Sequence, residues 1–154
     1  MKLLREAIIK DFPELMKEGV KIKCVGQLTD FPTDIQASIK KVEDESKQNR
    51  GVNLYIALSY GGRAEILAAA KKLMEQGLTN PSETDFSNAL WTADLPDPDL
   101  IIRTGGDQRL SNFLLWQAAY SELFFTPTYW PALTQEEFTS ILQNFAKRQR
   151  NFGQ

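Results

Sequence analysis

The chain has 154 residues, 42% of them hydrophobic and 25% charged, which predicts one ordinary globular domain over residues 1–154. A net charge of −2 excludes the positive field of a nucleic-acid-binding protein, so any anion must be recognised by a few placed cations. The absence of histidine excludes catalysis by a serine or cysteine that relies on a histidine base, and it excludes histidine zinc sites.

Any bound metal needs oxygen ligands, which favours Mg²⁺. The single Cys24 excludes an internal disulfide and is interpreted as a buried small hydrophobe, with a reactive thiol as the alternative. No apolar run has the length of about 20 residues that a bilayer requires, and the charged start lacks the apolar segment of a signal peptide. The sequence therefore predicts a cytoplasmic protein.

The first half of the chain alternates helical and strand patterns. Residues 2–18 carry a helical apolar stripe that is interrupted at Pro13, where a second short helix can begin. Residues 20–26 alternate apolar residues with lysines, as in a strand with one solvated face, and a helix is predicted over 33–49. Residues 52–62 form a nearly unbroken apolar run, which predicts a strand buried on both faces.

The second half continues the alternation. A helix is predicted to follow the apolar run and to stop at Gly77, and another is predicted over 84–92. A short strand over 99–103 leads into a loop and an apolar segment. A C-terminal helix begins with a capping box and a hydrophobic staple, has one apolar face and ends among cations. The box pairs Thr134 with Glu137, the staple pairs Leu133 with Phe138, the face is formed by Phe138, Ile141, Leu142 and Phe145, and the cations lie within 147–150.

Strands that alternate with helices imply βαβ units. The expected fold class is α/β, with a mostly parallel central sheet flanked by helices. Ligands of such folds bind at the carboxyl ends of strands, and two Gly-Gly loops, within 59–63 and 104–106, lie at these ends.

The loop after the strand 99–103 is the best candidate for chemistry. Arg103 ends the strand, Gly105 and Gly106 allow a tight turn, Arg109 follows, and Ser111 can cap a helix. Two guanidinium groups, a hydroxyl and free amide groups at a helix start all donate hydrogen bonds, and a phosphate offers only acceptors. The pattern indicates a phosphate or diphosphate site.

A purely structural interpretation stays open for both Gly-Gly loops. In the loop that contains Gly105 and Gly106, this interpretation pairs Arg103 with Asp99 or Asp107, leaves Arg109 solvated, and gives the glycines no role beyond the turn. The stretch SYGGR at 59–63 is likewise either a second phosphate loop that uses Arg63 or a tight strand-to-helix turn with Arg63 in an ion pair.

Three stretches carry a resemblance to a known family. They read ALSYGGRAEIL at 57–67, TADLPDPDLIIRTGGDQRLSNFLLWQAAYSELFF at 92–125 and WPALTQEEF at 130–138. In this order they resemble the cis-prenyltransferases, specifically the bacterial undecaprenyl diphosphate synthases, also called isoprenyl transferases. The similarity runs along the chain from roughly residue 2 to Gly153.

The resemblance implies an enzyme that joins isopentenyl diphosphate units to an allylic diphosphate with cis geometry. The cofactor is Mg²⁺, and the product is an undecaprenyl-type diphosphate that carries cell-wall precursors. By the same resemblance, Arg103, Arg109, Leu110 and Ser111 bind the diphosphate of isopentenyl diphosphate, and Glu122 is a Mg²⁺ ligand. Without the resemblance, Glu122 is interpreted as a surface carboxylate.

The position of Glu122 conflicts with a single diphosphate site on one straight helix that begins at Ser111. The two residues are eleven apart, which on one straight helix is about 16 Å along the axis, so they cannot both contact one diphosphate. We expect a strand from Glu122, because the following residues have high β preference. The alternatives are a neighbouring subunit or a different face of the site.

The chain departs from the family pattern at two places. Asp107 stands where the family commonly has glutamate, and the family's Asp-Gly-Asn-Gly-Arg loop with its catalytic aspartate does not occur, so no catalytic residue is assigned. We therefore expect an N-terminally truncated cis-prenyltransferase fold that carries the isopentenyl-diphosphate-binding half and has little or no activity alone. The alternative is a non-catalytic partner or scaffold subunit that completes the site of another subunit.

The resemblance also implies partners. It predicts a homodimer, with the apolar segment 112–125 as the candidate contact and ordinary core packing as the alternative. It implies an apolar tunnel for the growing chain, for which Val20, Ile22 and Cys24 are candidates, with core packing again as the alternative. Association with a membrane surface during product release is implied, and no nucleic acid is expected.

Overall fold

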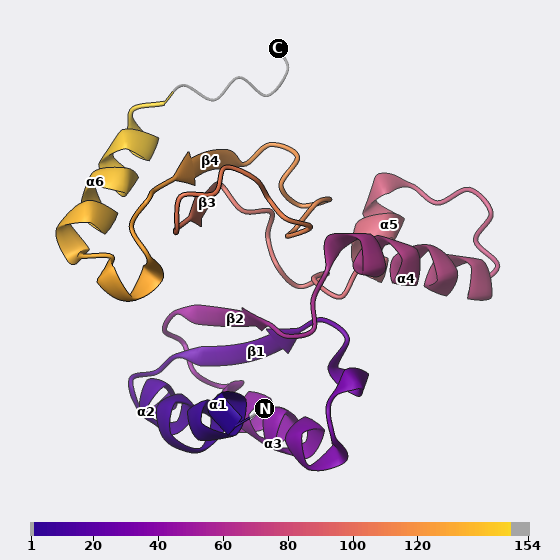
Figure 1. The fold of residues 1–154 in the computed structure, drawn as a ribbon. Helices are drawn as coiled ribbons and strands as arrows, with labels where there is room; N and C mark the ends of the chain where they lie inside the picture. The colour runs from indigo at the N-terminus through magenta and orange to yellow at the C-terminus, as the bar shows by residue number, and fades with distance from the viewer. Residues whose placement is uncertain (1, 149–154) are drawn as a thin grey trace. The chain divides into compact units, whose positions relative to one another are not determined.

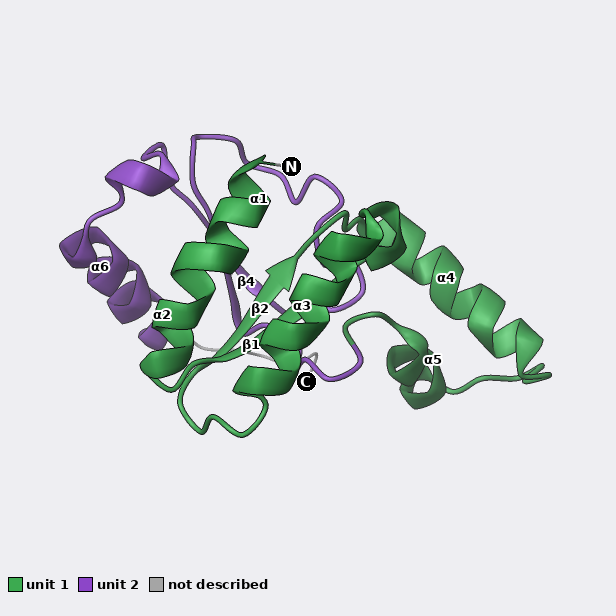
Figure 2. Cartoon of the chain, turned by 90° about the horizontal axis from the view of Figure 1, so that it is seen from below, with its two compact units in different colours: residues 1–92 green, residues 93–154 purple. Residues whose placement is uncertain are grey.

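The structure is a computed structural model that describes residues 2–148 (Figure 1). The chain forms two compact units, residues 1–92 and 93–154 (Figure 2). In both units helices accompany parallel strands, which confirms the α/β class, and the strands form two separate pairs in the described part of the chain. The single-domain organisation stays a prediction. Residues 149–153 of the predicted C-terminal segment lie outside the described residues.

The first unit begins with a nearly continuous helical segment. It comprises α1 (Lys2–Glu6), a π-helical turn (Ala7–Asp11) and α2 (Phe12–Lys17). Pro13 lies in the first turn of α2, directly after the π-helical turn, so the predicted second short helix is confirmed. After β1, a short 3₁₀ helix (Leu28–Asp30) precedes α3.

Strands β1 (Lys21–Val25) and β2 (Asn53–Ala57) pair in parallel, with Lys21 opposite Asn53. Helices α1, α2 and α3 (Thr33–Ser46) cover one face of this pair (Figures 1 and 2). The buried core between them consists of Ile8, Phe12, Ile22, Cys24, Ile35, Ile39 and Val42. Core packing is thus the observed role of Ile22 and Cys24, while half-buried Val20 packs against the same cluster.

The prediction that the strand from residue 52 is buried on both faces is wrong within this unit. The three central residues of β2 are half-buried and its two ends are exposed. The physical reason is that β2 has one strand neighbour, and the helices cover one face of the pair.

Side chains of α3 bond the outer edge of β1. The hydroxyl of Ser46 accepts a hydrogen bond from the amide of Ile22 at 3.1 Å and donates to its carbonyl at 3.3 Å. A carboxylate oxygen of Glu43 accepts from the amide of Cys24 at 2.7 Å. Strand amides on the side away from β2 therefore have partners, as buried backbone groups require.

Helix α4 (Gly62–Glu75) ends where the sequence predicts. Gly77 has a φ of 72°, and its amide bonds the carbonyl of Met74, while the amide of Leu78 bonds the carbonyl of Leu73. These two bonds form a Schellman motif, which satisfies the last carbonyls of the helix.

Helix α5 (Glu83–Ala89) is shorter than predicted because the next residue, Leu90, has extended backbone angles. Ser82 caps it, and Asp85 completes a capping box.

The second unit contains strands β3 (Leu100–Arg103) and β4 (Glu122–Phe125) and helix α6 (Gln135–Ala146), with a 3₁₀ turn at Trp130–Ala132. The strands pair in parallel, with Leu100 opposite Glu122 and Arg103 opposite Phe125. The predicted strand from Glu122 is therefore confirmed.

The N-terminus of α6 carries half of the predicted capping box. Thr134 accepts a hydrogen bond from the amide of Glu137 at 3.2 Å, but the Glu137 carboxylate bonds Thr126 instead of the Thr134 amide. On the predicted apolar face, Ile141 is buried and Phe145 half-buried, while Phe138 and Leu142 are exposed. The staple of Leu133 and Phe138 stays a prediction.

The predicted helix start at Ser111 is wrong. Residues 111–120 form successive turns, and positive φ angles occur at Ser111 (48°), Asn112 (68°) and Leu114 (45°). A right-handed helix requires negative φ, so these three residues exclude one at this point.

No helix within residues 2–148 combines the length and the apolar character that crossing a bilayer requires.

The Ser46→Ala variant should lower the free energy of unfolding by about 1–3 kcal/mol, because it leaves the amide and carbonyl of Ile22 without that buried partner. The matched control is Ser38→Ala on the same helix, whose hydroxyl bonds the helical carbonyl of Asp34 at 2.8 Å, and it should change the value by about 0.5 kcal/mol or less. Urea denaturation followed by circular dichroism measures both. Equal effects would contradict the edge-covering role of Ser46.

Cys24 should be unreactive toward a disulfide reagent at pH 8 in the folded protein. Its thiol is free and buried, and desolvation, together with the nearby Glu43 carboxylate, raises its pKa to about 12. The reactive thiolate is therefore scarce until the protein unfolds in urea, when the reaction should become fast. Rapid labelling of native protein would show that this thiol is accessible.

Candidate functional site

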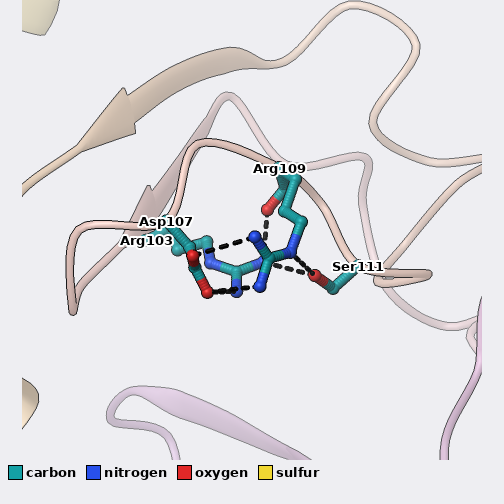
Figure 3. A network of polar contacts seen from close by, with 4 residues as sticks. All are labelled: Arg103, Asp107, Arg109 and Ser111. Carbon is teal, nitrogen blue, oxygen red and sulfur yellow. Dashed lines mark hydrogen bonds and ion pairs between the residues drawn. The ribbon is translucent and has the colours of Figure 1, made fainter.

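The end of β3 and the following turn form the candidate site. Arg103 is the last residue of the strand, and the chain then turns through Gly105 and Gly106, whose φ angles are 90° and 86°. These left-handed angles favour glycine, so the prediction of a tight Gly-Gly turn is confirmed. The turn brings the side chains of Asp107, Arg109 and Ser111 back toward Arg103 at the strand end (Figure 3).

The amides of the two glycines are already bonded within the protein. The Gly105 amide donates to the carbonyl of Thr128 at 3.0 Å, and the Gly106 amide donates to the carbonyl of Thr126 at 2.9 Å. No helix begins at Ser111 either, so the predicted donors of a helix N-terminus are not formed there. The donors that the structure brings together at the strand end are side chains.

Arg103 is held by three acceptors along the loop (Figure 3). Its guanidinium donates to the hydroxyl of Ser111 at 2.7 Å, to a carboxylate oxygen of Asp107 at 2.9 Å, and to the backbone carbonyl of Arg109. The side chain is 25% exposed. It is therefore fixed in place but reachable from solvent.

Arg109 makes a two-point contact with the same carboxylate. Its terminal nitrogens donate to the two oxygens of Asp107 at 2.8 and 2.6 Å, and its Nε donates to the hydroxyl of Ser111 at 3.1 Å. The structural interpretation that pairs Arg103 with Asp107 is thus confirmed. Its solvated Arg109 is also found, since this side chain is 63% exposed, but Arg109 is paired with Asp107 as well. Asp107 binds both guanidinium groups because the turn places it between them.

We name Arg103, Asp107, Arg109 and Ser111 the arginine cluster. Its two cations and one anion leave a formal charge of +1. Each guanidinium uses three of its N–H groups in the bonds above, which leaves two on each for a ligand. A phosphate that took the paired N–H groups of Arg109 would have to displace the carboxylate of Asp107.

A pocket of about 260 Å³ adjoins the cluster. Arg103, Thr104 and Arg109 contribute polar groups to its lining. The apolar part of the lining consists of Ile101, Ile102, Leu110 and Phe113. Leu110, a predicted substrate contact, therefore lies beside the two arginines, and the pocket joins cations with an apolar wall.

Glu122 lies apart from the arginine cluster within the unit. It begins β4 opposite Leu100, three residues before Arg103, or about 10 Å along the strand. Because side chains alternate along a strand, Glu122 and Arg103 also point to opposite faces. The carboxylate of Glu122 is paired with the guanidinium of Arg148.

The described residues were also tested for a metal site. Residues 2–148 contain no group of three aspartate, glutamate or cysteine side chains that could hold a metal ion. One carboxylate paired with an arginine does not fit a magnesium ion shared with the arginine cluster of the same chain. Glu122 as a metal ligand stays a prediction.

The stretch 59–63 forms the turn from β2 into α4. Gly61 is the N-cap residue of the helix, and Arg63 lies exposed in its first turn. The strand-to-helix turn is confirmed, and its use as a second phosphate loop stays a prediction.

Glu65 and Thr126 are two of the buried polar residues that the sequence did not predict. Glu65 is fully buried in α4 and accepts hydrogen bonds from the Tyr60 hydroxyl at 2.6 Å and from the amide and hydroxyl of Thr92 at 3.0 and 2.7 Å. Its spacing from buried Ala69 and Leu73 places it on the apolar stripe of the helix, which was an available signal. Thr126, 4% exposed, had no such signal.

The chain is similar to known proteins over nearly its whole length. The family described as "Putative undecaprenyl diphosphate synthase" matches residues 1–153. The chain is 42% identical over 153 residues to an isoprenyl transferase of Rickettsia felis, covering 99% of the chain and 65% of that protein. It is 43% identical over 159 residues to a ditrans,polycis-undecaprenyl-diphosphate synthase of Coxiella burnetii, covering 99% and 67%. The chain thus spans about two thirds of the length of these relatives.

Two solved structures are similar to the chain. A crystal structure of a probable undecaprenyl diphosphate synthase from Campylobacter jejuni has a TM-score of 0.89 at 36% identity, covering 99% of this chain and 72% of that one. Lavandulyl diphosphate synthase from Lavandula x intermedia, in complex with dimethylallyl diphosphate, has a TM-score of 0.92 at 33% identity, covering 100% and 70%.

The Gly106→Ala variant should weaken the binding of inorganic diphosphate by about tenfold, because relief of the left-handed φ moves Asp107 and the arginines. Gly19→Ala is a matched control, since Gly19 has a φ of 82° and a Cβ added there would meet nothing within 4 Å. A Cβ added at Gly106 would likewise meet no atom closer than 3.9 Å. Both variants should lose about 1 kcal/mol of stability. Isothermal titration calorimetry and urea denaturation separate the two effects, and equal diphosphate affinity in both variants would contradict the role of the turn.

Proposed function

The chain belongs to the cis-prenyltransferase family of the undecaprenyl diphosphate synthases, and on that premise we propose that it carries the isopentenyl-diphosphate-binding half of a cis-prenyl chain elongation site. In this proposal the arginine cluster binds the diphosphate group, and the product is an undecaprenyl-type diphosphate. The allylic partner is a second isoprenoid diphosphate.

The observation that carries the proposal is the combination of charge and apolar surface in one pocket. Arg103 and Arg109 present N–H donors, while Ile101, Leu110 and Phe113 line the same pocket of about 260 Å³. Isopentenyl diphosphate has a multiply charged head and a short hydrocarbon tail. Its head matches the donors and its tail matches the apolar lining, so binding also orients the carbon atoms that react.

The proposed role of the arginine cluster is to bind and orient the diphosphate group, and each of its donor side chains has a different role. Arg103, held by three acceptors, is the fixed donor. Arg109, with a side chain that is 63% exposed, is the donor that exchanges Asp107 for the ligand. Ser111 accepts from both guanidinium groups, and its hydroxyl proton is available for a phosphate oxygen.

Magnesium is part of the proposal through Glu122. When bound, this ion neutralises charge on diphosphate oxygens. Mg²⁺ commonly takes one or two carboxylates together with phosphate oxygens, so Glu122 would be one ligand once it is released from Arg148. Since Glu122 and the arginine cluster of one chain lie apart, we assign no step of the reaction to the metal.

We further propose a homodimer in which the segment 112–125 contributes to the contact. Phe113, Leu115 and Tyr120 of this segment are exposed in the single chain. Exposed large apolar side chains close together in sequence support a protein contact. The non-catalytic partner subunit is the second candidate, and the intact arginine cluster is compatible with it.

The proposal predicts that Arg103→Ala weakens the binding of inorganic diphosphate by about 100-fold, because the fixed guanidinium supplies charge-assisted hydrogen bonds. Arg5→Ala is the control, because Arg5 forms an exposed ion pair with Asp34 in the other unit and should have no effect. Isothermal titration calorimetry measures both. Unchanged affinity in Arg103→Ala would contradict the proposed site.

The transferase role is tested by incorporation of radiolabelled isopentenyl diphosphate with farnesyl diphosphate and Mg²⁺. Turnover that disappears in Arg103→Ala supports a catalytic chain. Diphosphate binding without turnover supports the partner subunit instead.

A further inference from the structure

Thr126 is a buried polar residue that the proposed binding of substrate does not use. It follows β4 directly, is 4% exposed, and uses all of its polar groups. Its amide donates to the carbonyl of Arg103 at 3.0 Å, and its carbonyl accepts from the amide of Gly106 at 2.9 Å. Its hydroxyl donates to a carboxylate oxygen of Glu137 at 2.6 Å and accepts from the amide of Thr128 at 3.2 Å.

We infer that Thr126, together with Glu137 as its acceptor, is a positioning residue that sets the geometry of the arginine cluster. The inference rests on the proposed function, because the cluster must bind a diphosphate for its geometry to matter. Thr126 itself contacts no ligand in this inference. It acts through the backbone that carries Arg103 and the glycine turn.

The backbone bonds of Thr126 fix both ends of the turn. The carbonyl of Arg103 lies before the turn and the amide of Gly106 lies within it, and both are bonded to the same residue. The distance between these two points of the loop is therefore set by one peptide segment. A displacement of that segment would move the strand end that carries the Arg103 guanidinium and the loop that carries Asp107.

The side chain of Thr126 fixes the segment in turn. Its hydroxyl is bonded to Glu137 in the first turn of α6, and the amide of Glu137 is bonded to the capping hydroxyl of Thr134. The first turn of α6 thus holds the segment that follows β4 in place through the bond between Glu137 and Thr126.

The use of the Glu137 carboxylate supports this interpretation independently. The sequence predicts that Glu137 bonds the amide of Thr134 in a capping box, yet its carboxylate bonds Thr126. The capping-box bond that the sequence predicts is therefore replaced by a bond to Thr126, the residue that bonds the backbone of Arg103 and Gly106. Small displacements there are consequential, since misplacement of a binding group by roughly 1 Å can reduce activity about 100-fold.

The test compares hydroxyl-bearing and hydroxyl-free variants by calorimetric titration with sodium diphosphate in the absence of divalent metal. Thr126→Val should raise the dissociation constant about tenfold, within the range of coupling between contacting residues. Thr126→Ser, which keeps the hydroxyl, should bind like the wild type. The control Thr139→Val removes a hydroxyl that bonds the helical carbonyl of Gln135 on exposed α6 and should also bind like the wild type.

A double-mutant cycle distinguishes positioning from a general loss of stability. If Thr126 acts through Arg103, Thr126→Val should cause no further loss of affinity in an Arg103→Ala background. A tenfold loss in both backgrounds would overturn the inference, as would wild-type affinity in Thr126→Val or failure of Thr126→Ser to restore binding. Should Thr126→Val not fold by circular dichroism, Glu137→Ala and Glu137→Gln decide the question. The first should lose affinity, and the second, which keeps an acceptor oxygen, should retain it.

The outcomes also separate this inference from the proposed function. If the wild type and Arg103→Ala bind diphosphate equally, the proposed site is wrong and the inference is wrong with it. If Arg103→Ala loses binding while Thr126→Val does not, only the positioning role is wrong.

Discussion

The second unit depends on the continuation of strand pairing past the ends of β3 and β4. The hydrogen bonds of the parallel ladder extend from Arg103 to Thr126 and then to the two glycine amides of the turn. A loop after a strand is usually a mobile part of a protein, but here both glycine amides are bonded to the neighbouring segment. The side chains of the proposed site therefore lie on a loop that is hydrogen-bonded to the segment after β4. Such a loop holds a site more rigidly than a loop without these bonds.

The same pairing determines which groups can act on a ligand. Because the turn amides are bonded to Thr126 and Thr128, they cannot cradle a phosphate in the manner of a glycine-rich loop. The cations and the Ser111 hydroxyl remain as donors. Recognition by guanidinium groups has a directional character, since their N–H groups lie in a plane and match pairs of phosphate oxygens.

The sequence predicted the parts of the fold that follow from local rules. The Schellman end at Gly77, the cap at Thr134 and the turn at Gly105 all follow from the residue types at those positions. Left-handed angles at Ser111 and Leu114 were not predictable, because nothing about these side chains favours them. Ser111 accepts hydrogen bonds from Arg103 and Arg109 at this point, and its residue type alone does not predict these contacts.

Buried polar residues are a second feature that local sequence patterns did not predict. Ser46 falls inside the helix predicted over 33–49, and Glu65 falls inside the helix predicted to stop at Gly77, yet both are fully buried and bond other segments of the chain. Their partners lie 24 and 27 residues away in the bonds to Ile22 and Thr92. Such partners are fixed by the tertiary fold, so the composition of a helix cannot identify them. In the candidate site, the sequence singled out the two arginines and Ser111, which the structure brings together, but it did not determine which of two acidic residues pairs with Arg103.

The pairing of Asp107 with both arginines has a consequence for selectivity among anions. With this carboxylate in place, an arriving anion must compete with an acceptor that already makes two-point contact with Arg109. Chloride, with a single charge and no pair of oxygens, gains too little to displace it, whereas a diphosphate can offer several oxygens to both guanidinium groups at once. In the proposed site, the carboxylate of Asp107 would thus disfavour monovalent anions, and it would give way to ligands with the charge and geometry to replace it.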